Sequence, residues 1–258
     1  MFLFHQIVFG PIHSRRLGSS LGINILPVYG KWCNFNCIYC ECGWNENGYG
    51  DNRIPGTQEV AKALEEKLSA LHLLNTPPDV ITFSGNGEPT LHPDFKPMLE
   101  ETLSLRNKYA PNAKVCVLSN ATQLDRPSVF EALQLADKRI LKIDSAFPET
   151  IERINQPVSY FNYSETLTEL KRFHGDFTLQ TLFVRGVYKG VPIDNATQAE
   201  VQAWLNIVME LRPKEVMIYT IDRKTPAKEL VKVPLAELEG IGDCVKALGM
   251  NIQVHIAG

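Results

Sequence analysis

Short apolar segments and longer amphipathic segments alternate along the chain from residue 21 onward. The apolar segments are rich in Val, Ile, Leu and Phe, which is typical of strands in a parallel sheet covered on both faces. They lie at 21–27, 79–85, 113–120, 139–145, 178–186, 215–222 and 251–256. The amphipathic segments place apolar residues at helical spacing. They predict helices at 56–74, 94–109, 127–137, 163–173, 198–212 and 234–249.

This order amounts to six strand–helix units and one final strand. Repeated right-handed crossovers of this kind build either a barrel or an open, doubly wound parallel sheet, and the periodicity alone does not separate the two. No linker or low-complexity stretch interrupts the alternation. We therefore predict a single α/β domain over residues 1–258, with a lead-in at 1–20 and the strand–helix units at 21–258.

The composition is that of an ordinary soluble globular protein, with 44% hydrophobic and 21% charged residues among 258. A formal net charge of −3 provides no global positive field to attract a large RNA partner. No apolar run approaches the roughly 18 residues that a membrane-spanning helix needs. The first residues place apolar before basic side chains, the reverse of a signal peptide. Together with free cysteines, these features predict a cytoplasmic protein without membrane association.

Three cysteines, Cys33, Cys37 and Cys40, follow the first predicted strand with the spacing C-x3-C-x2-C. Three thiolates can hold three irons of a cubane cluster and leave the fourth iron open, whereas a cluster that only carries electrons usually has four cysteine ligands. A structural zinc site is the alternative, but it prefers paired C-x2-C knuckles and no second pair follows. Cys42 is a candidate fourth ligand; its one-residue gap from Cys40 gives poor reach, so we interpret it as a bystander. The other cysteines are not grouped, so only one cluster is predicted.

Polar residues follow several predicted strands, at the ends where functional groups of α/β barrels gather. After the second strand, the segment Gly85-Asn86-Gly87-Glu88 combines glycines that permit close backbone approach with a carboxylate that can receive an ammonium group. A plain turn is the alternative. Further candidates near later strand ends are Ser119, Asn120, Lys142, Asp144, Gln180, Arg185, Tyr219 and Arg223.

Several of these candidates have structural alternatives. Lys142 and Asp144 share one side of their strand, so they could contact substrate or form an ion pair, which is costly inside a barrel unless fully hydrogen-bonded. Gln180 fits an outward position as well as an inward one, and Asn120 with Thr122 could instead cap the following helix. Arg223 could form a surface pair with Asp222.

The lead-in carries two adjacent arginines, Arg15 and Arg16. Guanidinium groups bind carboxylate and phosphate through their fork geometry, so this pair is a candidate anion site. Two surface arginines without a binding role are the alternative.

The cysteine run has an aromatic residue, Tyr39, before its last cysteine, and the glycine–glutamate segment comes one strand–helix unit later. In these features the chain resembles the radical S-adenosylmethionine (radical SAM) superfamily. The resemblance implies a partial (β/α)6 TIM-like barrel of parallel strands, here with an extra C-terminal strand and an N-terminal lead-in. It implies one [4Fe–4S] cluster on Cys33, Cys37 and Cys40, whose open iron takes the amine and carboxylate of SAM. The SAM contacts expected from it are Tyr39, Gly85, Asn86, Gly87, Glu88, Ser119, Asn120 and Gln180. Substrate contacts are expected at Arg15, Arg16, Lys142, Asp144, Arg185, Tyr219 and Arg223.

The activity implied by this resemblance is reductive cleavage of SAM to a 5′-deoxyadenosyl radical, which abstracts hydrogen from a substrate. An external one-electron donor of the flavodoxin or ferredoxin type would supply the electron. The segments 10–18, 83–93 and 217–223 are similar to the group related to the wyosine tRNA-base synthases. A tRNA base or nucleoside is therefore one candidate substrate, although the net charge does not favour RNA. The alternatives are an activase that installs a glycyl radical on a partner protein, and a non-catalytic binding protein stabilised by zinc or an iron–sulfur cluster.

Overall fold

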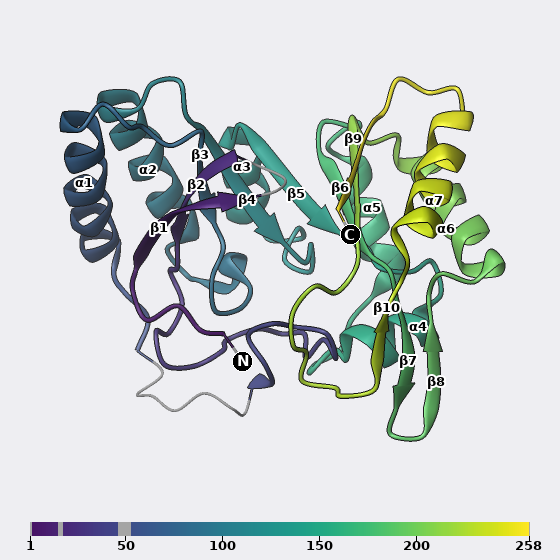
Figure 1. The fold of residues 1–258 in the computed structure, drawn as a ribbon. Coiled ribbons are helices and arrows are strands. Elements are labelled where there is room, and N and C mark those ends of the chain that lie inside the picture. The colour runs from purple at the N-terminus through teal and green to yellow at the C-terminus, as the bar shows by residue number, and fades with distance from the viewer. Residues whose placement is uncertain (1, 15–17, 46–52, 258) are drawn as a thin grey trace.

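The computed structural model describes residues 2–14, 18–45 and 53–257. Its main sheet has eight strands in the order β1-β2-β3-β4-β5-β6-β9-β11 (Figure 1). All neighbouring strands are parallel except β1 and β2, which form an antiparallel pair. The strands are β1 (Val8–Ser14), β2 (Gly18–Ile23), β3 (Val80–Phe83), β4 (Lys114–Ser119), β5 (Lys138–Lys142), β6 (Thr178–Leu182), β9 (Glu215–Tyr219) and β11 (Gln253–Ala257).

Helices follow most of the parallel strands and cover the sheet, with α1 and α2 beside its first half and α6 and α7 beside its second (Figure 1). Each buries one apolar face; in α1 this face consists of Val60, Leu64, Leu68 and Leu71. The helices are α1 (Thr57–Leu73), α2 (Phe95–Tyr109), α3 (Pro127–Leu135), α4 (Pro148–Asn155), α5 (Tyr163–Lys171), α6 (Gln198–Leu211) and α7 (Leu235–Ala247), with a 3₁₀ turn, η2, at Pro89–Leu91. No helix in the described ranges is both long and apolar enough to cross a membrane.

The sheet does not close, because β1 and β11 each have a neighbour on one side only. Six consecutive parallel strands, β2 to β6 and β9, therefore form a partial barrel, and β11 extends it. The sequence prediction of a parallel α/β sheet of this type is confirmed. Because the strands run in the same direction, their carboxyl ends and the loops that follow meet at one edge of the sheet.

Three local features differ from the elements expected from the sequence. The lead-in contains a strand of the main sheet, since β1 pairs with β2 through Val8–Ile23 and Ser14–Gly18. The predicted strand at 178–186 is two strands, because β7 (Val184–Tyr188) leaves the main sheet. It joins β8 (Val191–Asp194) and β10 (Leu230–Lys232) in a small antiparallel sheet. Helix α4 lies between the predicted strand at 139–145 and the predicted helix at 163–173, where no element was expected.

Candidate active site

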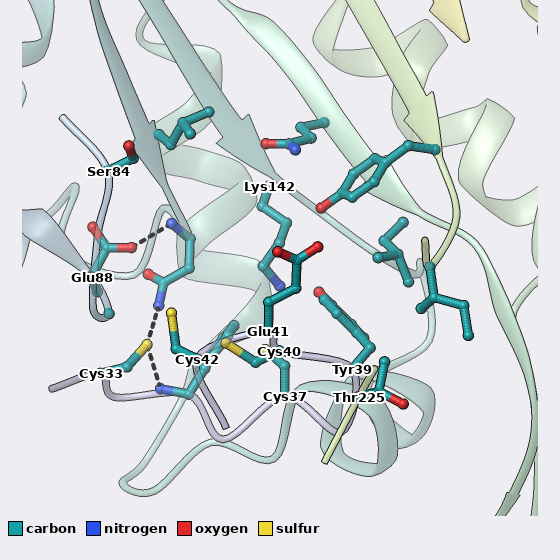
Figure 2. Close-up of a pocket in the computed structure, with 18 of the residues that line it drawn as sticks. Cys33, Cys37, Tyr39, Cys40, Glu41, Cys42, Ser84, Glu88, Lys142 and Thr225 are labelled. Carbon is teal, nitrogen blue, oxygen red and sulfur yellow. Dashed lines mark hydrogen bonds between the residues drawn. The ribbon is translucent and has the colours of Figure 1, made fainter. Parts of the chain in front are cut away.

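A cavity of about 420 Å³ lies at the carboxyl ends of the parallel strands. Figure 2 shows the cysteine sulfurs in its lower part, with Glu88 above them at the left and Lys142 above them near the centre. The predicted residues that line it are Cys33, Cys37, Tyr39, Cys40, Gly85, Gly87, Glu88, Ser119, Asn120, Lys142, Gln180, Tyr219 and Arg223. Side chains far apart in the sequence thus share one space.

The cysteine loop is fixed by backbone hydrogen bonds to three other segments. Trp32 N donates to Asn86 O at 2.8 Å, beside the glycine–glutamate loop. Ile38 N donates to Ile154 O at 2.9 Å, at the end of α4, and Ala227 N donates to Ile38 O at 3.1 Å. The loop also belongs to a separate apolar cluster, in which Phe35, Ile38 and Tyr39 pack with Ile154, Leu182, Val184, Ile193 and Ala227. Backbone hydrogen bonds and apolar packing therefore both fix the loop that carries the three thiols.

Gly87 shows how tightly the two loops approach each other. It has φ of +143°, and a Cβ atom at this position would lie 1.8 Å from Trp32 O. Only glycine fits such a contact. The glycine in this segment is thus required by the packing of the glycine–glutamate loop against the cysteine loop.

The thiols lie in an environment that disfavours bare thiolates but provides a cation. Burial raises the pKa of Cys33 to about 12 and also raises that of Cys37. A hydrogen bond from Cys42 lowers the pKa of Cys40 to about 6, against the effect of burial. Lys31 is 6% exposed and donates from Nζ to Gly43 O at 3.0 Å. Burial would lower the pKa of Lys31, but the surrounding thiols raise it above its ordinary value.

These residues fit an iron–sulfur cluster. Buried thiolates need a positive partner, which iron supplies, and the Lys31 ammonium compensates the remaining negative charge. Among the described residues, no three His, Cys, Asp or Glu side chains converge on a point that would hold one metal ion. A cubane does not require such convergence, because it binds each cysteine at a different iron.

Glu88 is a buried carboxylate surrounded by neutral donors. It is 2% exposed, and its Oε1 accepts from Thr90 N at 3.1 Å and from Thr90 Oγ1 at 2.6 Å. Its Oε2 accepts from Asn120 N at 2.6 Å. Burial raises the pKa of Glu88 above its ordinary value, although these hydrogen bonds by themselves would lower it. A cation that enters the cavity would therefore find a fixed, uncompensated carboxylate.

Asp144 is a buried carboxylate with its own cation. Lys142 Nζ lies 3.0 Å from Asp144 Oδ2, which also accepts from the Tyr39 hydroxyl and from Asn155 Nδ2 at 2.7 Å. Leu182 N donates to Asp144 Oδ1 at 3.1 Å. Burial would lower the pKa of Lys142, but Asp144 raises it above its ordinary value. The ion pair foreseen from the sequence is present and hydrogen-bonded; Lys142 lines the cavity, whereas Asp144 supports it from behind.

Two predicted site residues have other partners. The Asn86 side chain is fully buried and donates from Nδ2 to Phe4 O at 2.9 Å and to Pro27 O at 2.8 Å. Its side chain does not line the cavity and instead holds the backbone of two other segments, so the structure gives it a structural role. Arg185 lies on β7, where it pairs with Glu237 at 2.7 Å and with Asp194 at 3.4 Å. It is not among the cavity residues, because the chain leaves the main sheet before reaching it.

The remaining predictions differ in outcome. Arg223 lines the cavity and pairs with Glu41 at 2.7 Å, while Asp222 lies 3.6 Å from Lys232, so the expected Asp222–Arg223 pair is replaced by two others. Arg15 and Arg16 lie outside the described residues. Cys42, interpreted as a bystander, lines the cavity and donates from Sγ to Gly85 O at 3.4 Å.

Sequence reasoning missed two buried polar residues beside the thiols, Lys31 and Asn155. Lys31 has a weak signal, a lysine two residues before the first cysteine. Asn155 has none, because it ends a helix that was not predicted. Phe4, from the N-terminal segment, also lines the cavity.

Comparisons with known proteins agree with this geometry. The family model described as the radical SAM superfamily matches residues 28–190. A UPF0026 protein of Synechocystis sp. is 34% identical over 241 residues, which cover 92% of this chain and 80% of that protein.

Two solved structures are similar in fold. SuiB of Streptococcus suis, bound to S-adenosylmethionine, has a TM-score of 0.65 at 15% identity over 89% of this chain, which spans about half (49%) of SuiB. Archaeal TYW1 has a TM-score of 0.54 at 12% identity, covering 88% of this chain and 71% of that protein. At these identities the two structures bear on the fold alone.

Proposed function

We propose a function for this chain from one premise: it belongs to the radical SAM superfamily. It is an enzyme of that superfamily, which implies a [4Fe–4S] cluster and SAM as cofactors. When bound together, these groups supply one-electron cleavage of the SAM sulfonium and hydrogen abstraction from a C–H bond. The chain's own residues bind, orient and enclose them.

The observation that carries the proposal is that the buried carboxylate of Glu88 and the three thiols line one cavity. We assign Cys33, Cys37 and Cys40 to the cluster. We assign Glu88 to the ammonium group of SAM, because all its described hydrogen-bond donors are neutral. Ser119, Asn120 and Gln180 are polar, at most 7% exposed and on the cavity wall, so we assign them to other polar groups of SAM.

We propose a small polar substrate of nucleoside size, entering beside Lys142, Tyr219 and Arg223. These three side chains line the same cavity as the residues assigned to SAM, so a substrate that contacts them would lie next to bound SAM. The similarity of several segments to wyosine tRNA-base synthases supports a nucleoside or an exposed RNA base, while the net charge of −3 argues against extensive RNA contact. The electron would come from an external flavodoxin- or ferredoxin-type donor. We place the enzyme in the cytoplasm, where cluster thiols stay reduced.

The test is anaerobic reconstitution with iron and sulfide, followed by incubation with SAM and dithionite. Wild-type protein should cleave SAM to methionine and 5′-deoxyadenosine. Cys37→Ala should lose this cleavage, whereas Cys244→Ala, which removes an exposed cysteine on α7, should retain it. Cleavage that survives Cys37→Ala, or zinc that restores the fold without any cleavage, would contradict the proposal.

The substrate class is tested separately in the same assay. Nucleosides and total tRNA are added in turn, and the rate of 5′-deoxyadenosine formation is measured. Stimulation by a nucleoside or by tRNA is expected. If neither stimulates cleavage nor binds at low salt, the nucleoside proposal is wrong. The proposal that the enzyme cleaves SAM is not affected by that result.

A further inference from the structure

Asn155 is a buried amide at the junction between the cysteine loop and helix α4. It is the last residue of α4 and 1% exposed, and the next residue, Gln156, ends the helix with φ of +45°. Asn155 O accepts from Asn36 N at 2.9 Å, and the preceding Ile154 O accepts from Ile38 N. These bonds fix the helix end against the loop on both sides of Cys37, so the position of the Asn155 side chain is determined by the backbone.

The Asn155 amide nitrogen faces three acceptors. Nδ2 lies 2.7 Å from Asp144 Oδ2, 3.5 Å from Cys37 Sγ and 3.3 Å from the Tyr39 hydroxyl oxygen. A primary amide has two N–H groups. The short contact to the Asp144 carboxylate takes one of them, which leaves the other for Cys37 and Tyr39. The residue that binds Cys37 is thus oriented by Asp144.

We propose that Asn155 is a positioning residue that donates a hydrogen bond to the Cys37 sulfur and thereby raises the reduction potential of the cluster. The inference rests on the proposed function, because it concerns the cluster that this function requires. Reduction adds one electron and therefore one negative charge to the cluster. A hydrogen bond donated to a ligating sulfur stabilises that added charge, and such bonds are among the factors that set iron–sulfur potentials.

The other two thiols have donors of different kinds. Cys33 Sγ accepts from Phe35 N at 3.4 Å and lies 3.8 Å from Asn120 Nδ2. Cys40 is close to the Lys31 ammonium, which lowers its pKa in addition to the larger effect of Cys42. Asn155 is therefore the donor specific to Cys37. It also links this thiol, through Asp144 Oδ2, to Lys142 on the cavity wall.

The test is a redox titration of the reconstituted, SAM-free protein, with the EPR signal of the reduced cluster as the readout. Asn155→Leu keeps the approximate side-chain volume and removes both N–H donors. We expect the equilibrium constant for one-electron reduction to fall about tenfold, which is a decrease of about 59 mV in potential. The matched control is Asn195→Leu. Asn195 is also 1% exposed and bonds to Asp144 O at 2.8 Å and Leu182 O at 2.7 Å, but contacts no thiol.

A second measurement detects the amide nitrogen beside the cluster. In wild-type protein with asparagine labelled by ¹⁵N in its side chain, pulsed EPR should detect ¹⁵N coupled to the reduced cluster. Asn120 Nδ2, 3.8 Å from Cys33 Sγ, contributes as well, so the coupling assigned to Asn155 is the part that Asn155→Leu removes. If the potential of Asn155→Leu equals that of the wild type and of Asn195→Leu, the proposal is overturned. The absence of ¹⁵N coupling in the wild type, or a coupling that Asn155→Leu leaves unchanged, overturns it too. If wild-type protein assembles no cluster at all, as judged by iron, sulfide and absorbance, the proposed function itself is refuted.

Discussion

Two carboxylates, each 2% exposed, differ in their place and in their partners: Glu88 lines the cavity, whereas Asp144 lies behind the cavity residue Lys142. Glu88 accepts three hydrogen bonds from neutral groups of Thr90 and Asn120. Asp144 accepts from neutral groups as well, but it is also paired with Lys142. A buried carboxylate with a cation is compensated in the protein alone, whereas one without a cation is compensated only when a positive ligand arrives. This difference indicates that Glu88 binds a positively charged ligand, whereas Asp144 holds Lys142 in place.

Asp144→Asn is expected to have the largest effect on folding. It leaves the Lys142 ammonium, whose side chain is 13% exposed, without its counter-charge. Breaking a buried pair in this way costs about 3–5 kcal/mol. Urea denaturation of the cluster-free protein measures this loss. The control is Asp243→Asn, which breaks an exposed pair with Lys246 and should change the free energy of unfolding by under about 0.5 kcal/mol.

Glu88→Gln should give the opposite pattern. It should weaken SAM binding strongly, without the loss of about 3–5 kcal/mol of folding stability expected for Asp144→Asn. Loss of a buried charge partner weakens binding by about 2–5 kcal/mol, so the affinity of the reconstituted protein for SAM should fall by about thirtyfold or more. Equilibrium binding without reductant measures it. If Asp144→Asn weakened SAM binding as much while leaving stability unchanged, the division of roles between the two carboxylates would be wrong.

The pH dependence of stability sharpens the same comparison. Burial raises the pKa of Glu88 above its ordinary value of 4.5, so the folded protein keeps a proton that the unfolded chain has lost. The stability contributed by protonated Glu88 is complete below pH 4.5 and is lost as the pH rises through the folded pKa. The free energy of unfolding of the cluster-free wild type, minus that of Glu88→Gln, should therefore decrease across this window. An increase with pH would mean that Glu88 has a cationic partner in the free protein.

The ion pair of Arg223 with Glu41 should have the smallest effect. Its side chains are 60% and 44% exposed, and such surface pairs contribute about 0–1 kcal/mol. Arg223→Gln should leave the free energy of unfolding within about 0.5 kcal/mol of the wild type. A loss of several kcal/mol would show that this pair holds the cysteine loop in place, a role that the structure gives to backbone hydrogen bonds.

The residues recovered from sequence are those whose chemistry depends on short spacing. Cys33, Cys37 and Cys40 belong to one loop, and Glu88 follows a strand whose apolar run is unmistakable. Their shared cavity follows from the parallel order of the strands. Lys142 was recovered for the same reason, as a charge at a strand end.

The residues that were missed or misplaced depend on contacts between distant segments. Asn155 reaches Cys37 only because α4, an eight-residue helix, packs against the cysteine loop. Arg185 was placed at a strand end, but the chain turns into a second sheet after Leu182. Asn86 lies between two cavity residues, yet its side chain is held by the backbone of Phe4 and Pro27. No local sequence pattern predicts these contacts between distant segments.

The central claim is that the cavity between Glu88 and the three thiols receives SAM at the open iron. Pulsed EPR of the reduced, reconstituted protein with SAM labelled by ¹⁵N at its amino group tests it most directly. The account predicts that ¹⁵N couples to the cluster in the wild type, and that the coupling weakens in Glu88→Gln at the same SAM concentration. A wild-type cluster whose spectrum is unchanged by saturating SAM would contradict it.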